Sequence, residues 1–76
     1  MKNILCIEIL SNDVYIEFIN GDIQYMSFTQ AKKILSRESH NSMKFFCTDS
    51  IRSVDFLNSL LHKYEILNDT LVLKTN

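Results

Sequence analysis

The chain has 76 residues, of which 46% are hydrophobic and 22% are charged, and its formal net charge is −1. This length and composition predict a single compact domain over residues 1–76, near the size at which one hydrophobic core just suffices. Eight Lys and Arg against nine Asp and Glu do not supply the cationic surface of a non-specific nucleic-acid binder, so direct nucleic-acid binding is not expected. The longest apolar run, from Ile4 to Leu10, is too short for a membrane span or a signal peptide, so we expect a cytoplasmic protein that does not bind membranes.

Residue usage is biased toward Ile, Asn, Lys, Ser and Leu, whereas Gly, Ala, Pro and Arg together number four. Most codons of the first group are AT-rich, so this bias indicates an AT-rich genome, such as that of a phage, a plasmid or a low-GC bacterium. Cys6 and Cys47, in a chain that is not expected to be exported, are predicted to be reduced, buried thiols.

Alternating apolar and polar residues predict three antiparallel strands at the N-terminus, over residues 4–10, 14–19 and 22–26. A turn within Ser11-Asn12-Asp13 joins the first two strands. Asn20-Gly21 joins the second and third, and this dipeptide is typical of a two-residue type I′ turn, in which both central residues have positive φ. The chain is therefore predicted to begin with two adjoining β-hairpins.

A two-residue turn at Asn20-Gly21 determines which side chains of the hairpin share a face. It places Phe18 opposite Ile23 and Ile16 opposite Tyr25, with the even-numbered side chains of the second strand in the core. The covered face of the sheet would then bear Leu5, Ile7, Ile9, Val14, Ile16, Phe18 and Ile23. The opposite, open face would bear Ile4, Cys6, Glu8, Tyr15, Glu17, Ile19, Gln24 and Met26.

A first helix is predicted from about Phe28 to Ser39. Ser27 and Gln30 have the spacing of a capping box, and Met26 and Ala31 stand at the positions of a hydrophobic staple. An apolar stripe at helical spacing is formed by Phe28, Ala31, Ile34 and Leu35. The basic side chains that point away from this stripe are Lys32, Lys33 and Arg37.

The remaining chain is predicted to form a strand, a second helix and a C-terminal strand. Met43 to Thr48 has apolar residues on both faces, as expected of an interior strand. The helix is capped by Asp49, Ser50 or Ser53, and its apolar side consists of Ile51, Val54, Leu57, Leu60, Leu61 and Tyr64. Asn68-Asp69 is a turn before a strand over 71–73, which would gain a partner if residues 65–67 also form a strand. The order β-β-β-α-β-α-β predicts an α+β fold, an antiparallel-rich sheet with two helices packed on one face.

No motif indicates an enzyme, so we expect no catalytic residues. His40 and His62 have no Cys or carboxylate at the spacing of metal ligands, and neither a metal site nor a cofactor is expected. Cys47 lies where a strand meets a helix N-terminus, a place that lowers thiol pKa values. The alternative of a thiol enzyme is disfavoured because no general base accompanies it, and a core position is the expected one.

Two surfaces are candidate binding sites. The outer side of the first helix carries Lys32, Lys33 and Arg37, but no aromatic residues alternate with them as single-stranded nucleic-acid binding would require. The open face of the sheet mixes apolar and acidic side chains, a composition more typical of an interface than of a solvated face. The partner-binding residues predicted there are Glu8, Tyr15, Glu17, Ile19, Asp22, Gln24 and Met26.

The leading hypothesis is a non-enzymatic protein-binding module that acts by occupying a partner's surface. An inhibitor of host defence from a phage or mobile element, an immunity protein or an antitoxin would have this size, charge and genome bias. A phage-encoded protein would act in the host cytoplasm. Glu8, Glu17 and Asp22 would complement the basic groove of a nucleic-acid-binding enzyme. A homodimer through the same face or through an exposed strand edge is compatible with this hypothesis. The alternative is a nucleic-acid-associated regulator that uses the basic patch formed by Lys32, Lys33 and Arg37.

Overall fold

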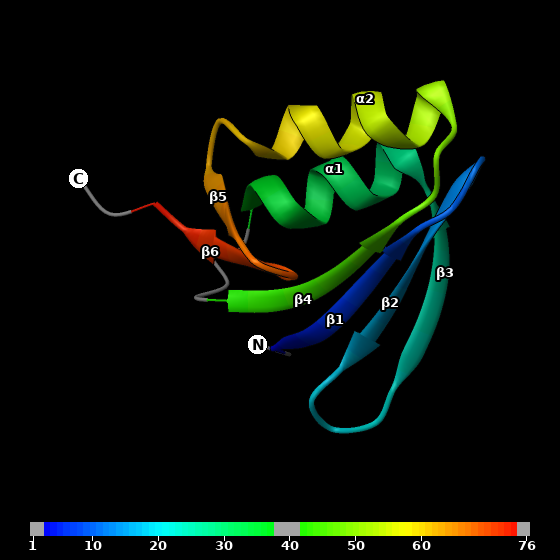
Figure 1. Ribbon diagram of the computed structural model, residues 1–76. Coiled ribbons are helices and arrows are strands. Elements are labelled where there is room, and N and C mark those ends of the chain that lie inside the picture. The colour runs from blue at the N-terminus through cyan, green and yellow to red at the C-terminus, as the bar shows by residue number, and fades with distance from the viewer. Residues whose placement is uncertain (1–2, 38–41, 75–76) are drawn as a thin grey trace.

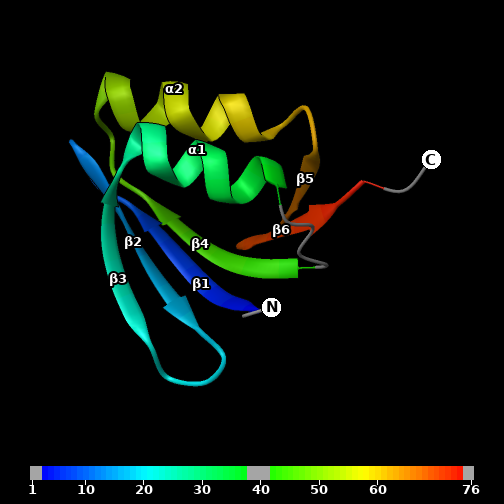
Figure 2. The same cartoon turned by 180° about the vertical axis from the view of Figure 1, so that it is seen from behind.

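The computed structural model describes residues 3–37 and 42–74. Its six-stranded sheet has the order β3-β2-β1-β4-β6-β5, and both helices lie side by side on one face of the sheet (Figures 1 and 2). The elements are β1 Ile4–Ile9, β2 Asp13–Phe18, β3 Ile23–Ser27, α1 Phe28–Arg37, β4 Ser42–Cys47, α2 Ile51–Leu60, β5 Tyr64–Leu67 and β6 Thr70–Leu73. The predicted α+β class and order of elements are confirmed, with β5 as the additional strand.

The centre of the sheet is a parallel pair, β1 with β4, and all other neighbouring strands are antiparallel. β1 to β3 form a meander of consecutive antiparallel strands, and the chain then crosses the sheet through α1 before it returns as β4 beside β1 (Figure 1). β3 and β5 form the two edges of the sheet.

The first hairpin has the predicted turn and the predicted orientation of β2. Ser11 and Asn12 form a two-residue loop, because the Leu10 N–H donates to the Asp13 carbonyl at 2.9 Å. The even-numbered side chains of β2 are buried, whereas the odd-numbered ones are half-buried on the other face. The even/odd assignment of β2 is therefore confirmed.

A β-bulge changes the beginning of β1. The register with β2 shifts between Ile4 and Cys6, so Leu5 is an extra residue without a direct partner. Ile4 consequently joins Ile7 in the core, while Leu5 is 47% exposed. The prediction that Leu5 faces the core and Ile4 faces away from it is wrong for this reason.

The second hairpin has a three-residue loop instead of the predicted two-residue turn. The Phe18 N–H donates to the Asp22 carbonyl at 2.9 Å, and the Gly21 N–H donates to the Phe18 carbonyl at 2.9 Å. Gly21 has a φ of +95°, whereas Asn20 is not among the described residues with positive φ. This combination is a type I turn followed by a glycine bulge. The Asn20 side chain supports it by accepting the Asp22 N–H at 3.0 Å.

The longer loop shifts the register of β3 by one residue, and a shift of one residue exchanges the faces of a strand. Tyr25 lies opposite Tyr15, and Ile23 lies opposite Glu17. Both side chains are on the open face, where Tyr25 is 67% and Ile23 53% exposed. The prediction that they face the helices is wrong.

The same shift moves two predicted partner-binding residues away from the open face. Met26 pairs with Val14 and is only 8% exposed, within the hydrophobic core. Gln24 pairs with Ile16 and therefore lies on the side of the sheet that carries the helices. Their assignment to the open face is corrected accordingly.

α1 begins and packs as predicted. The Ser27 hydroxyl oxygen accepts the Gln30 N–H at 3.2 Å, the first half of the expected capping box. Ala31 and Leu35 are buried. The ring of Phe28 stacks on that of Phe56 from α2, with centroids 5.0 Å apart, and this contact joins the two helices.

α2 is capped by Ser50, whose hydroxyl oxygen accepts the Ser53 N–H at 3.1 Å. Ser53 is completely buried, and its hydroxyl donates to the Thr48 carbonyl at 2.7 Å, so the end of β4 and the start of α2 are tied together.

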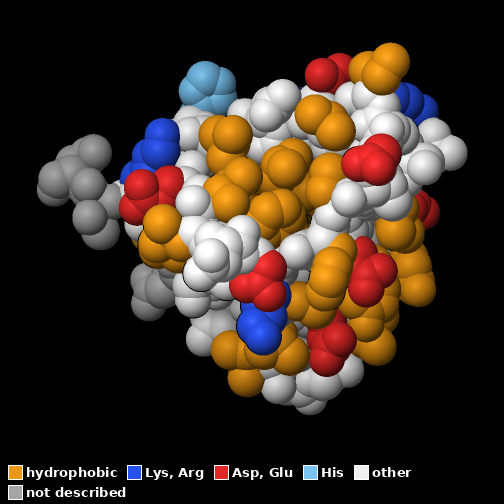
Figure 3. Space-filling model, viewed as in Figure 1, with side chains coloured by type: hydrophobic (Ala, Val, Ile, Leu, Met, Phe, Trp, Pro, Cys, Tyr) orange, Lys and Arg blue, Asp and Glu red, His pale blue; other side chains and the backbone are white. Residues whose placement is uncertain are grey.

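The buried face of α2 agrees with the prediction only in part. Leu60 and Tyr64 are buried and Leu57 and Leu61 pack against the core, as predicted. Ile51 is 82% and Val54 41% exposed, however, and their predicted places are taken by Ser53 and Phe56, because Phe56 is held against α1. In Figure 3 hydrophobic side chains gather below α2 in the middle of the view.

Two lysines bind the carbonyl groups at the C-termini of the helices. The Lys63 ammonium group donates to the carbonyls of Leu35 and Ser36 in α1, at 3.0 and 3.3 Å. Lys74 donates to the Leu61 carbonyl after α2 at 2.7 Å. A cation at this end of a helix satisfies carbonyls that lack intrahelical partners and is favoured by the helix dipole.

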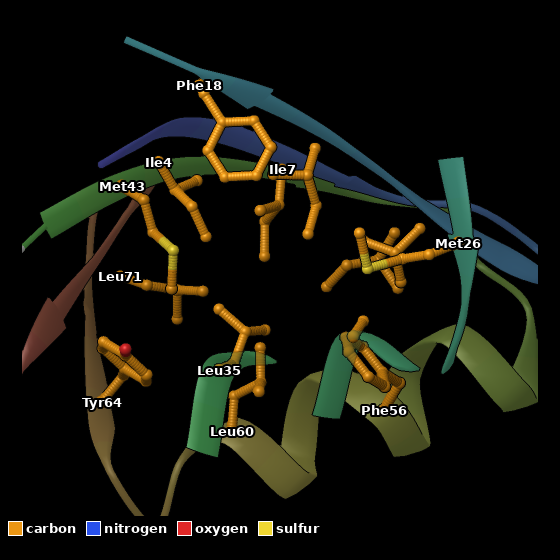
Figure 4. Packing of buried hydrophobic residues seen from close by; sticks show 14 residues of the cluster. Ile4, Ile7, Phe18, Met26, Leu35, Met43, Phe56, Leu60, Tyr64 and Leu71 are labelled. Atoms are coloured by element: carbon orange, nitrogen blue, oxygen red, sulfur yellow. The ribbon is translucent and has the colours of Figure 1, made fainter. Parts of the chain in front are cut away.

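The core lies between the sheet and the two helices. Figure 4 shows Leu35, Phe56 and Leu60 pointing from the helices toward the strands. The labelled strand residues that meet them are Ile4, Ile7, Phe18, Met26, Met43, Tyr64 and Leu71.

Replacing Gly21 with alanine should lower the free energy of unfolding by about 1 kcal/mol, because an L-residue is strained at positive φ. An added Cβ would meet no atom within 4 Å, so the loss is conformational and not steric. Urea denaturation measures it. Gly21→Asn should cost less than Gly21→Ala; equal losses would contradict a positive φ at this position.

Alanine substitutions in α2 should distinguish the buried face of the helix from its exposed face. Phe56→Ala should cost about 3 to 5 kcal/mol through loss of the stacked ring and a cavity, whereas Ile51→Ala should stay within about 0.5 kcal/mol. Chemical denaturation of both variants provides the comparison. A larger loss for Ile51→Ala would favour the helix face predicted from the sequence.

Candidate functional site

The open face of the sheet, on the side away from the helices, carries a row of three aromatic side chains and one carboxylate. Pairing places Tyr25 of β3 beside Tyr15 of β2, Tyr15 beside Glu8 of β1, and Glu8 beside Phe46 of β4. We call these four side chains the aromatic row. Both ends are open to solvent, with Tyr25 67% and Phe46 62% exposed.

A second row runs parallel to the first, two residues along each strand. It consists of Ile23, Glu17, Cys6 and Lys44, from β3, β2, β1 and β4 respectively. Glu17 therefore lies next to the apolar Ile23 on one side and the thiol of Cys6 on the other. In Figure 3 acidic side chains are interspersed with hydrophobic ones over this part of the sheet.

Side-chain contacts hold the two rows together. The Tyr15 hydroxyl donates to the Glu17 carboxylate at 3.1 Å, and the Cys6 thiol lies 4.0 Å from the same carboxylate oxygen. Tyr15 also meets Tyr25 edge to face, with ring centroids 5.3 Å apart. These contacts give Tyr15 a fixed orientation, which reduces the entropy it would lose in a complex.

The surroundings of the Cys6 thiol and the Tyr15 phenol favour the neutral form of both groups. Burial raises the pKa of the Cys6 thiol, the negative charges of Glu17 and Glu8 raise it further, and Lys44 opposes them. Burial, together with the hydrogen bond to Glu17 and its charge, also raises the pKa of Tyr15. The face therefore offers a phenol donor and carboxylate acceptors but not a reactive thiolate.

The structure brings three of the predicted partner-binding residues together on this face, namely Glu8, Tyr15 and Glu17. Ile19 is exposed in the β2–β3 loop. Asp22 is exposed beside this loop but lies opposite Phe18, and therefore on the side of the sheet that carries the helices. Gln24 and Met26 lie on the opposite side, as described above.

Three exposed apolar residues of the open face were not predicted to bind a partner, namely Ile23, Tyr25 and Phe46. A three-residue loop ending at Gly21 would have identified the first two, and it agrees with the sequence as well as the type I′ turn does. Phe45 and Phe46 are consecutive residues of β4 and lie on opposite faces of the sheet. The apolar composition of both faces of this strand could have indicated that one of the two rings is on the open face.

The basic patch is on the helical layer, away from the open face. Lys32, Lys33 and Arg37 are all exposed on α1. Nearby, the guanidinium of Arg52 lies over the Phe28 ring at 5.5 Å. Arg52 also donates to the Asn12 side chain at 2.9 Å, which ties α2 to the first hairpin turn.

The cysteine and histidines considered for catalysis or metal binding are Cys47, His62 and His40. Cys47 is half-buried against the core, and its thiol lies 3.4 Å from the Thr48 carbonyl. His62 is exposed after α2, and His40 lies outside the described residues. Within residues 3–37 and 42–74, no three His, Cys, Asp or Glu side chains are grouped as a metal site would require. No helix in this part of the chain has the length and apolarity to cross a membrane.

Comparisons with protein-family models, curated proteins and solved structures found no match to this chain. The function is therefore inferred from the surface of this chain.

Replacing Glu17 with glutamine should increase alkylation of Cys6 by iodoacetamide several-fold at mildly alkaline pH. Removal of the negative charge lowers the pKa of the thiol, so that more of it is ionised. Mass spectrometry of the modified peptides measures the rate at Cys6, with Cys47 as the internal control. Unchanged or slower labelling of Cys6 would contradict the electrostatic coupling.

Proposed function

We propose that this chain is a non-enzymatic protein-binding module that occupies its partner's surface through the aromatic row and the second row. The observation that supports the proposal is the aromatic row itself, in which the half-buried ring of Tyr15 and the exposed ring of Phe46 lie on the two sides of the Glu8 carboxylate. A solvated sheet face is normally polar, and aromatic side chains are enriched at the centres of interfaces.

The chemistry of the two rows favours a partner that presents arginine among apolar side chains. A guanidinium group forms paired hydrogen bonds with a carboxylate and stacks on aromatic rings, and Glu8 has a ring on each side. Glu17 provides a second carboxylate one row away, whereas Lys44 would repel a cation placed next to it. The proposed partner surface is therefore basic and apolar, as in the groove of a nucleic-acid-binding enzyme.

In this proposal the chain is an inhibitor: an antagonist of host defence from a phage or mobile element, an immunity protein or an antitoxin, acting in the cytoplasm. The net charge of −1 and the bias in residue usage support this assignment. An inhibitor that covers a basic groove competes with nucleic acid through charge complementarity.

The test uses purified chain, immobilised and exposed to nuclease-treated lysate of its host, followed by measurement of affinity for the captured protein. Phe46→Ala and Glu8→Arg should each weaken binding about tenfold or more, as expected for residues at the centre of an interface. The double variant Lys33→Glu with Arg37→Glu is the matched control on the helical layer and should bind as the wild type does.

The opposite result would contradict the proposal. If the double variant abolishes binding while Phe46→Ala and Glu8→Arg leave it intact, the open face is not the site. Capture that occurs only in lysate without nuclease treatment, and that the double variant abolishes, would instead favour a nucleic-acid-associated regulator that uses the basic patch.

A further inference from the structure

The outer edge of β3 carries unpaired backbone groups. Bonded and non-bonded residue pairs alternate along an antiparallel ladder. The Phe18 N–H donates to the Asp22 carbonyl, so the even-numbered residues of the third strand are those bonded to β2. The backbone N–H and C=O groups of Ile23 and Tyr25 and the N–H of Ser27 therefore point outward, away from the sheet, whereas the C=O of Ser27, as the N-cap residue, accepts the first bond of α1.

This edge lacks the features that protect natural sheet edges. Such edges usually carry lysine, proline, a bulge or a very short strand. The five residues of β3 read IQYMS, without a charge or a proline, and their register with β2 is regular. The opposite edge, β5, has four residues including Glu65, and Lys63 and Lys74 lie beside it.

We infer that the edge of β3 pairs with β3 of a second copy of this chain, antiparallel and around a two-fold axis at Tyr25. This register places Tyr25 opposite Tyr25 of the second copy, and Ile23 opposite Ser27. It pairs the outward N–H and C=O of Tyr25 with those of Tyr25 in the second copy, and the outward C=O of Ile23 with the N–H of Ser27. The two sheets become one continuous sheet.

The side chains of this edge are complementary to themselves. Tyr25 already meets Tyr15 within one chain, so the two-fold axis lines up four tyrosines across the joined open faces. Aromatic cross-strand pairs stabilise a sheet, and no like charges face each other because β3 has none.

Charge complementarity at the ends of the strand also favours a second copy as the occupant. The same register brings Asp22, which precedes β3, near the start of α1 of the other chain. The first turn of α1 has no acidic residue of its own. A carboxylate near a helix N-terminus is stabilised by the helix dipole.

The dimer adds to the proposed function without depending on it. It lengthens the open face and leaves Glu8 and Phe46 free, because both lie on the strands farther from the β3 edge. A small domain also gains stability by covering exposed side chains such as Ile23 and Tyr25.

The molecular mass in solution tests this inference through a pair of charged variants. Light scattering coupled to size-exclusion chromatography should give a mass of two chains for the wild type. Tyr25→Lys and Tyr25→Glu should each give the mass of one chain, because two like charges meet at the two-fold axis. An equimolar mixture of the two variants should recover the mass of two chains, since lysine then faces glutamate.

Two further variants separate the edge from general effects. Ile23→Pro removes an outward N–H without removing a bond to β2, so it should yield a folded monomer by circular dichroism. Ile66→Lys introduces a lysine on the β5 edge, as Tyr25→Lys does on the β3 edge, and this variant should remain dimeric. The inference would be overturned if the wild type had the mass of one chain. It would also be overturned if Tyr25→Lys and Ile23→Pro both kept the mass of two chains, or if the mixture of Tyr25→Lys and Tyr25→Glu stayed monomeric. Phe46→Ala should not change the mass, so failure of the dimer and failure of the proposed binding face are distinguishable.

Discussion

The loop between β2 and β3 is the constraint on which the candidate site depends. Side chains in a strand alternate between faces, so one additional residue in a loop reverses the whole strand that follows. The positive φ of Gly21 closes the three-residue loop, and this loop turns Tyr25 and Ile23 to the open face and Met26 into the core. The aromatic row, the second row and the outward backbone groups of β3 all follow from that orientation.

The helical layer shows why a count of charges is a poor guide to binding surfaces in so small a protein. Lys63 and Lys74 lie in the C-terminal part of the chain, yet each binds carbonyl groups at the end of a helix. Arg52 is likewise bound to Asn12 and rests on an aromatic ring. Part of the positive charge thus holds the layers together, while the carboxylates of Glu8 and Glu17 lie on the side that carries the proposed partner site.

The sequence was informative wherever local forces decide the structure. Periodicity and capping residues predicted the order of the elements, the orientation of β2 and the start of α1, because these depend on residues a few positions apart. The loop at Gly21 was mispredicted because two turn types agree equally well with Asn-Gly. The bulge at Leu5 and the buried face of α2 depend on distant contacts, such as the stacking of Phe28 on Phe56, and these have no local signal. Three of the eight residues in the two rows were therefore identified, namely Glu8, Tyr15 and Glu17, all on β1 and β2.

The parallel pairing of β1 with β4 has a consequence for how the chain acquires its structure. The meander of β1 to β3 involves near neighbours and can form early, but β1 has to wait for a segment some forty positions later before its second side is covered. In a nascent or refolding chain, this hydrophobic central strand is temporarily an edge. Arrival of β4 is therefore the step at which we expect folding to be slowest, and the interval before it is when the chain is most prone to aggregate.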